Sequence, residues 1–323
     1  MKRLWRIACI ILLLVVVGEL VRNALFPREP VYQGITASVY LDSYALYIDP
    51  KGGSFGLLTA AQSQAIDREG KLAETALRQM GIDLIPVLLQ KAAAKDSKLK
   101  SKLNDWGQRY LLVQNTLRAF GSWPMRYAFT SHSMAKDGFE LLGPSAVRAV
   151  PQLMELLRDP DEDVVANVAM SLSAIGPDAR QALPVLMDVA KNRSGRARAN
   201  AIFALGSLGP AAALSADVLI EGTKAADPGV TFYALQSLGR IHAKPEIVVP
   251  ILQAVLDTPQ TDNTRYDVAI AGLGRFGASS ESAVPSIIQH LHNKVDYVRR
   301  DATNALEQIE KDVAAKKKPK SSL

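Results

Sequence analysis

The sequence is poor in cysteine and in aromatic residues, and both shortages narrow the kinds of protein it can be. Its 323 residues include a single cysteine, Cys9, so a disulfide framework and a cysteine-based zinc site are both excluded. Aromatic residues make up 6% of the chain, although 48% of it is hydrophobic. A core built mainly from aliphatic side chains and alanine suits closely stacked helices better than a β-sandwich.

The body of the chain also lacks an excess of one charge. The net charge of +6 divides into +3 over residues 1–30, +4 in the C-terminal tail and −1 over residues 31–313. A duplex-binding surface needs several clustered Lys and Arg contacts to phosphates. The near-neutral body therefore argues against nucleic acid as the partner and leaves room only for a local basic patch.

The N-terminus has the pattern of an export signal. Lys2, Arg3 and Arg6 precede an apolar run from Ile7 to Gly18, as a basic segment precedes the apolar centre of a secretory signal. The run is shorter than a full membrane span, but extending it to Phe26 supplies the length.

We therefore expect residues 1–30 to be a signal peptide or a single transmembrane anchor, with residues 4–26 in the membrane. The basic end stays in the cytoplasm in both cases. The rest of the chain would be anchored to the inner membrane and face the periplasm or another extracytoplasmic space. It would be secreted if the segment is cleaved. Cys9 precedes the apolar centre, so its position does not support lipid attachment.

Prolines mark an internal repeat with a constant period. Pro151, Pro184 and Pro250 stand 33 and 66 residues apart, and Asp217 occupies the missing register. Pro285 follows after 35 residues, which indicates a two-residue insertion. A fixed period of this length is the signature of a repeat architecture.

Three further sets of residues share this period. Eight residues before each register position, an apolar residue is followed by Gly143, Gly176, Gly209, His242 or Gly277. Ten residues after it, with the insertion allowed for, stand Asp161, Ser194, Asp227 and Asp262. Twenty-one residues after it stand Leu172, Leu205, Leu238, Leu273 and Leu306.

Each set predicts a part of a helical hairpin. Asp or Ser can cap the first turn of a helix, and glycine past its end can adopt the left-handed conformation. Proline at the first position of the next helix loses no hydrogen bond. Two such helices cannot bury their apolar faces alone, so neighbouring pairs must stack. The sequence therefore predicts an all-α fold, a right-handed α-solenoid of short repeats about 33 residues long.

Two segments resemble a known repeat family. Residues 142–153 (LGPSAVRAVPQL) and 296–302 (DYVRRDA) look like the HEAT-like repeats of phycobilisome lyases. The resemblance covers about residues 134–310, and it implies a repeat class rather than an activity. The Thr-Pro-Leu-His signature of ankyrin repeats and the Trp/Tyr pattern of tetratricopeptide repeats are both missing.

The chain is expected to contain five segments. They are the signal or anchor (1–30), a capping or linker segment with several tyrosines between 32 and 47 (31–70), degenerate helical repeats (71–133), the HEAT-like array (134–311) and a basic disordered tail (312–323).

No set of residues has the spacing of a catalytic, cofactor or metal site. His290 and His292 are two apart on an expected helix and point away from each other, with no third ligand nearby in the sequence. His242 fills a glycine register, which favours a role at a helix end. We predict no catalytic residue, no cofactor and no metal.

Charged residues on the second helix of three units are the candidate partner-binding residues. Acidic and basic residues alternate there at i, i+3 spacing: Glu155 with Arg158, Asp188 with Lys191, and Glu221 with Lys224. One interpretation is a solvated face laced with salt bridges. The other is a binding surface, since resemblance to HEAT arrays implies that the second helices line the concave face. Mixed charge suits a protein partner better than a phosphate backbone.

These patterns favour a non-enzymatic protein–protein interaction scaffold, membrane-anchored or exported, that binds partners through the concave face. Two alternatives stay open. One is an accessory or lyase-like factor of an enzyme system, which rests on the resemblance alone. The other is a nucleic-acid-binding helical repeat, which the expected export and the neutral body oppose.

Overall fold

The computed structural model describes residues 29–48, 60–95, 128–259 and 263–317, and the chain forms two compact units, residues 1–90 and 91–323. No helix in the described ranges is long and apolar enough to cross a membrane. The expected signal or anchor falls on residues 1–30, of which residues 1–28 lie outside the described part of the chain.

The first unit joins a small hairpin to a pair of packed helices. Two residues with positive φ, Gln33 and Gly34, turn the chain between two antiparallel strands. The helix that follows packs against the next one, and a glycine, Gly70, lets them meet closely at Tyr47. In chain order the elements are β1 (Val31–Tyr32), β2 (Ile35–Thr36), α2 (Ala37–Ile48), α3 (Ala60–Met80), the 3-10 helix η1 (Gly81–Leu84) and α4 (Ile85–Ala92).

The expected boundary at 70/71 is wrong, because α3 crosses it without interruption. The end of α3 is followed by the same succession of glycine, 3-10 helix and proline that separates the helices of several later units. Gly81 has a φ of 54° and is followed by a 3-10 helix and by Pro86 at the start of α4. This part of 71–133 therefore has the form of a repeat, whereas residues 96–127 lie outside the described ranges.

The second unit is an array of helical pairs. Its α-helices are α7 (Ala128–Leu142), α8 (Val150–Leu156), α9 (Glu162–Ile175), α10 (Leu183–Asn192), α11 (Gly195–Ser207), α12 (Ala216–Gly222), α13 (Pro228–Ile241), α14 (Pro245–Asp257), α15 (Thr264–Phe276), α16 (Val284–Gln289) and α17 (Asp296–Lys317). Its 3-10 helices are η2 (Gly143–Ala149), η3 (Gly176–Ala182), η4 (Gly209–Ser215), η5 (Gly277–Ala283) and η6 (His290–His292).

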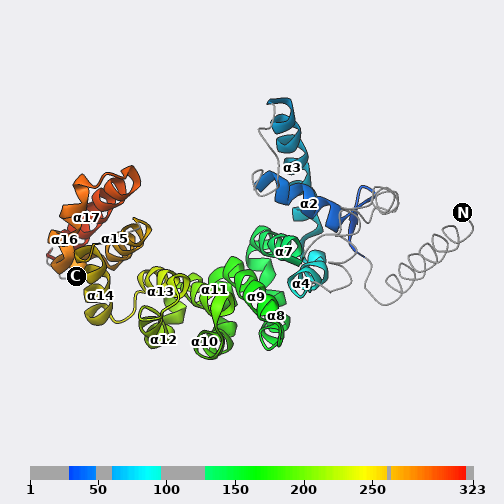
Figure 1. Ribbon diagram of the computed structural model, residues 1–323. Coiled ribbons are helices and arrows are strands. Elements are labelled where there is room, and N and C mark those ends of the chain that lie inside the picture. Colours follow the sequence, from blue (N-terminus) through cyan, green and yellow to red (C-terminus); the bar gives the residue numbers. More distant parts are fainter. Residues whose placement is uncertain (1–28, 49–59, 96–127, 260–262, 318–323) are drawn as a thin grey trace, which may run out of the picture. The chain divides into compact units, whose positions relative to one another are not determined.

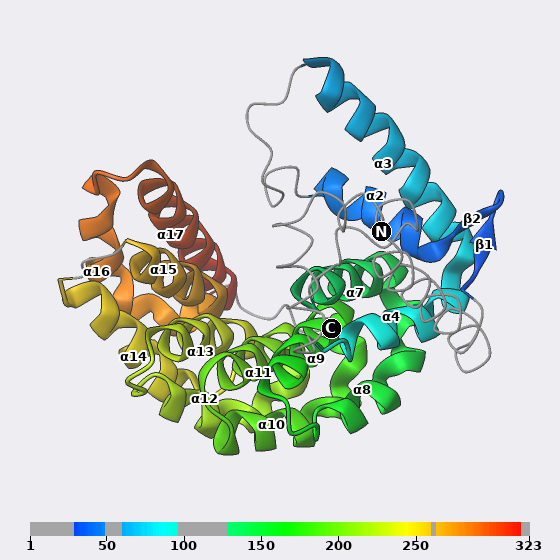
Figure 2. The same cartoon turned by 45° about the vertical axis from the view of Figure 1, so that its right-hand side comes forward.

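The helices of the array form two layers (Figure 1). The odd-numbered helices α7 to α17 pack side by side along their lengths, and we call them the inner layer. The even-numbered helices α8 to α16 form the outer layer, in which neighbours touch only lightly. Figure 2 shows α9, α11 and α13 on the concave side of the array, with α8, α10 and α12 on its convex side.

The core between the layers is aliphatic, as expected from the shortage of aromatic residues. Leu172, Leu205, Leu238 and Leu273 are fully buried at equivalent places on successive inner helices. Leu306 lies on the last inner helix and is only partly buried. The periodic leucines therefore mark the contact between the two layers, as their spacing predicts.

The periodic glycines end the inner helices as expected. Gly143, Gly176, Gly209 and Gly277 all have positive φ, between 53° and 69°. His242 likewise has a positive φ, 52°, and the centroid of its ring lies 5.6 Å from that of Phe276. The helix-end role predicted for His242 is confirmed.

The helix starts are confirmed only in part. Asp161 and Asp227 accept hydrogen bonds from the first turns of α9 and α13, but the side chain of Ser194 makes no capping bond. Asp262 lies outside the described residues. Between the glycine and the second helix stands a 3-10 helix rather than a simple turn. Pro250 lies inside α14, because this helix already begins at Pro245.

The end of the array also differs from expectation. α17 continues to Lys317, well into the segment predicted to be a disordered tail. Alanine and lysine, which dominate this stretch, are strong helix formers. Residues 318–323 lie outside the described ranges.

Glycines also bring neighbouring inner helices into backbone contact. A Cβ at Gly206 would lie 2.7 Å from the Cα of Ser237, and one at Gly239 would lie 2.7 Å from the Cα of Gly272. A Cβ at Gly274 would lie 3.1 Å from the Cα of Ala305. Gly206, Gly239 and Gly274 are 33 and 35 residues apart, so they follow the period of the repeat. Sequence reasoning missed this set.

Candidate functional site

The six predicted charged residues all lie exposed on or at the ends of outer-layer helices α8, α10 and α12. The expectation that the second helices line the concave face is wrong, because the tightly packed inner helices occupy that side (Figure 2). Within the ranges that the structure describes, no ion pair joins Glu155 to Arg158, Asp188 to Lys191, or Glu221 to Lys224. Of their side chains in the described part of the chain, that of Asp188 has a hydrogen-bond partner: its carboxylate accepts a hydrogen bond from the side-chain amide of Asn192 (2.7 Å).

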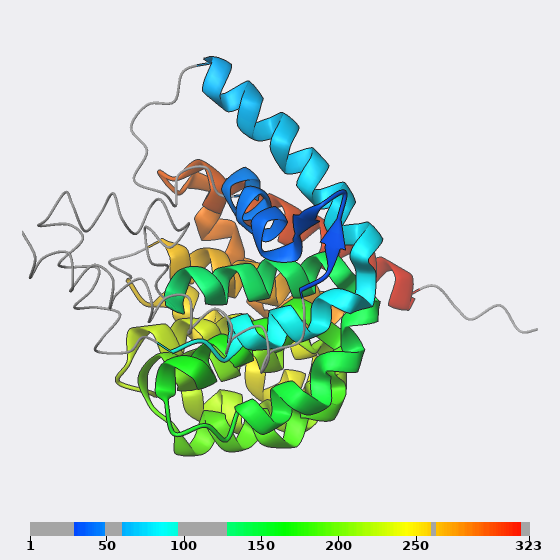
Figure 3. The same ribbon diagram turned by 90° about the vertical axis from the view of Figure 1, so that its right-hand side faces the viewer.

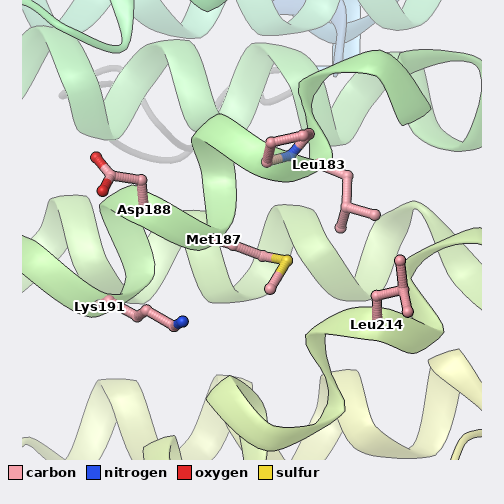
Figure 4. Close-up of a pocket in the computed structure, with 6 residues that line it drawn as sticks. Leu183, Met187, Asp188, Lys191 and Leu214 are labelled. Carbon is pink, nitrogen blue, oxygen red and sulfur yellow. The ribbon is translucent and has the colours of Figure 1, made fainter.

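The structure gathers three of these six residues around α10. A shallow pocket of about 380 Å³ opens between α10 and η4; Figure 4 shows Met187 and Leu214 on its apolar side and Asp188 and Lys191 at its rim. The side chain of Leu214 is 80% exposed. A second pocket of about 390 Å³ lies between α8 and α10 and includes Arg158 and Asp188. Glu155, Glu221 and Lys224 line neither of these two pockets.

A different cluster stands on the inner layer. The ring centroids of Phe203 on α11 and Tyr233 on α13 are 5.2 Å apart, and those of Phe232 and Tyr233 are 5.5 Å apart. The guanidinium of Arg240 lies 5.1 Å from the centre of the Phe203 ring, at cation–π distance. All four side chains are partly buried. We call Phe203, Phe232, Tyr233 and Arg240 the aromatic–arginine cluster.

Arg240 has no carboxylate partner among the described residues. Burial lowers the pKa of Arg240, and the positive charge of Arg275 on the next inner helix, α15, lowers it further. Arg275 itself is exposed. Two arginines from neighbouring repeats thus stand close enough to affect each other, and the partly buried one makes no ion pair.

An acidic pair borders the same surface on α15 and α17. Burial and, after it, the neighbouring carboxyl of Asp301 raise the pKa of Asp267 to about 6, while Arg300 and Arg275 oppose the shift. The pKa of Asp301 is lowered, first by its hydrogen bond with Asp267. The shared proton therefore resides on Asp267.

The two buried histidines of the array, His132 and His290, have structural partners. His132 is buried, with Nε2 2.7 Å from the carbonyl oxygen of Ala94 and Nδ1 in contact with the side-chain amide of Asn167. His290 is also buried, and its ring lies 4.5 Å from that of Tyr266. In the described part of the chain, no group of three or more His, Cys, Asp or Glu side chains is placed to hold a metal ion.

The sequence matches one repeat family. Residues 138–197 and 183–271 match the profile of HEAT repeats. This part of the chain is therefore similar to HEAT repeats in sequence. No curated protein sequence matches the chain significantly.

The chain is also similar to solved structures of helical-repeat proteins, at low sequence identity. The karyopherin Kap121p, bound to the extreme C-terminus of the protein phosphatase Cdc14p, is 13% identical with a TM-score of 0.50 over 85% of this chain and 34% of its own. A designed armadillo repeat protein in complex with the peptide (KR)4 is 14% identical with a TM-score of 0.44, covering 84% of this chain and 99% of its own. The CpcE–CpcF complex of phycocyanin lyase from Nostoc is 20% identical with a TM-score of 0.38, covering 50% and 99%. These similarities concern the helical-repeat fold alone.

Sequence reasoning missed the aromatic–arginine cluster, although the repeat register contains a signal for it. Phe232 stands 33 and 66 residues after Ala199 and Ala166, and Tyr233 stands 33 after Asn200. Large aromatic residues at positions that carry small or polar residues in the preceding units indicate a local surface feature, because the aliphatic core is already filled by the periodic leucines.

Proposed function

We propose that the protein is a non-enzymatic scaffold, membrane-anchored or exported, that binds partner proteins on the inner layer of its HEAT array. The observation that carries this proposal is the aromatic–arginine cluster on the inner helices α11 and α13, in which three partly buried rings lie beside an arginine that has no carboxylate partner among the described residues. Aromatic and arginine side chains are enriched at the centres of protein interfaces and supply most of their binding energy.

The remaining features support binding rather than catalysis. The array is a repeat fold whose surface is extended, and its two buried histidines are engaged with backbone carbonyls and neighbouring side chains. Export rests on the basic and apolar pattern of residues 1–30 alone. The six charged residues of the outer layer stay a second, independent prediction for a partner-binding surface.

Site-specific photo-crosslinking in the native membrane tests the inner-layer proposal. A photoreactive phenylalanine analogue replaces Phe232 in the full-length protein, a conservative change at an aromatic position. A matched control carries the same analogue at Gln181, which is exposed on η3. We expect a discrete crosslinked adduct from position 232 and none from position 181. Equal crosslinking from both positions, or adducts from position 181 alone, would exclude the inner layer as the specific surface.

A further inference from the structure

We propose that the aromatic–arginine cluster and Arg275 bind an acidic segment of the partner protein, with Asp or Glu side chains of that segment on the two arginines and an apolar side chain on the aromatic rings. This inference rests on the proposed function and specifies the chemistry of its partner. It is carried by the arrangement of α11, α13 and α15. Arg240, which has no carboxylate partner among the described residues, stands over the Phe203 ring beside two further rings, and Arg275 on the next inner helix is close enough to act on its charge.

The partial burial and the charge of Arg240 favour a carboxylate as its ligand. A partly buried guanidinium loses part of its hydration, and a carboxylate in bidentate contact replaces the lost water with two strong hydrogen bonds. Arg240 has lost hydration in this way without gaining a carboxylate, because it is stacked on Phe203 and has no carboxylate partner among the residues that the structure describes. The nearby charge of Arg275 disfavours a basic partner and favours an acidic one.

Several other arginines of the array, unlike Arg240, form ion pairs with carboxylates of the array. Arg196 on α11 has a carboxylate partner, Asp163 at 3.3 Å. Arg299 and Arg300 are likewise paired, with Asp296 and Asp301. Among the described inner-layer arginines without a carboxylate partner, which also include Arg198, Arg265 and Arg275, Arg240 is the one stacked on an aromatic ring.

The side chains on either side of the two arginines limit the surface that an acidic segment can occupy. Beyond Arg275 lie Asp267 and Asp301, a carboxyl pair that already shares a proton. A further carboxylate at that place would be repelled, so the acidic part of the partner is expected to end at α15. Toward α11 the surface is aromatic, and side chains such as Leu or Phe can pack against Phe203, Phe232 and Tyr233.

Binding of defined peptides to the full-length protein in detergent tests the proposal. The probe is a fluorescently labelled peptide in which Glu alternates with Leu, and two matched peptides carry Gln or Lys in place of Glu. By fluorescence anisotropy at low salt, we expect the Glu peptide to bind about tenfold more tightly than the Gln peptide or better. Its affinity should fall as salt is raised. Equal binding of the Lys peptide would overturn the proposal.

Substitutions then locate the site. Arg240→Gln and Arg275→Gln should each lower the affinity for the Glu peptide by about tenfold, while the exposed Arg180→Gln on η3 removes the same charge elsewhere and should leave it unchanged. Arg275 is exposed, so its variant tests the site even if Arg240→Gln unfolds the array. Equal losses in all three variants would show nonspecific electrostatic binding and contradict the assignment.

The outcomes separate the two proposals. Crosslinking from position 232 without binding of the Glu peptide would retain the scaffold and reject an acidic partner. Binding of a phosphoserine version of the peptide together with failure of the Glu version would also reject carboxylates as the ligand. Loss of both crosslinking and peptide binding would reject the inner layer altogether.

Discussion

At the scale of single residues, the periodic leucines carry the stability of the array. Leu205 is fully buried at the contact of the two layers. Its replacement by alanine removes buried apolar surface and leaves a cavity, so we expect Leu205→Ala to lower the free energy of unfolding by about 2–5 kcal/mol in urea denaturation. Leu214→Ala is the matched control, because its side chain is 80% exposed and should change stability by less than about 0.5 kcal/mol. Similar losses in both variants would contradict this view of the core.

The pair of Asp267 and Asp301 makes stability depend on pH. The pKa of Asp267 is about 6 in the fold, whereas an unfolded Asp titrates near 3.9. The folded state therefore binds more protons between these values, and its stability should decrease as pH rises through this window and then level off. Asp301 has a lowered pKa, so its own contribution falls below this window.

Asp267→Asn tests this dependence, because its amide can donate to Asp301 as the protonated acid does. We expect urea denaturation of the unmodified protein to show stability decreasing from about pH 4 to about pH 6, and the variant to show a flatter profile. The variant should gain most relative to the original protein above pH 6, where repulsion between the two carboxylates is greatest. An unchanged slope in the variant would mean that other groups cause the dependence.

At the scale of helices, capping separates positions that look equivalent in the sequence. Asp227 accepts hydrogen bonds from the backbone N–H groups of Gly229 (2.8 Å) and Val230 (3.3 Å), whereas Ser194 accepts none. We expect Asp227→Ala to lower the free energy of unfolding by about 1 kcal/mol and Ser194→Ala to have a much smaller effect. Thermal or urea unfolding followed by circular dichroism measures both, and equal effects would mean that the register alone decides the contribution.

Helix ends could be predicted from the sequence better than the connections between them. The positive φ of Gly176 and of His242 follows from the register, because a helix must end there and few residues tolerate positive φ. The 3-10 helices could not be predicted, since proline is compatible with either kind of turn. The place of Pro250 inside α14 depends on Lys244, whose left-handed conformation starts that helix early.

The sequence could not predict which helices form the inner layer, and it therefore could not locate the candidate site on that layer. Periodicity shows which face of a helix is buried, but it does not show which of two layers is the more tightly packed. That difference depends on contacts between helices 33 residues apart, such as that of Gly206 with Ser237. The candidate residues lie on or at the ends of the second helices, as expected, but these helices form the convex side of the array rather than its concave side (Figure 2).

At the scale of the whole molecule, export is the prediction with the widest consequence. A reporter that is active only outside the cytoplasm, fused after Leu323, should be active in cells. Deletion of residues 7–17 should abolish its activity, because the apolar run is what a secretion system recognises. Activity of a reporter that works only in the cytoplasm, fused at the same position, would contradict export.

The two faces of the array also differ in their chemistry (Figure 3 gives the view along it). The outer layer carries separate charged residues around shallow pockets, such as that at Asp188, and the inner layer carries stacked rings and arginines. A scaffold with two unlike faces can hold one partner without blocking the other.

The backbone contacts at Gly206, Gly239 and Gly274 have a mechanical consequence. Inner helices that touch through their backbones cannot approach further, and they have no intervening side chains that could rearrange. The outer helices touch lightly and have room to spread or close. We expect the array to bend about the glycine line as about a hinge, so that tension applied along it opens the outer layer first and changes its curvature while the inner spacing stays constant.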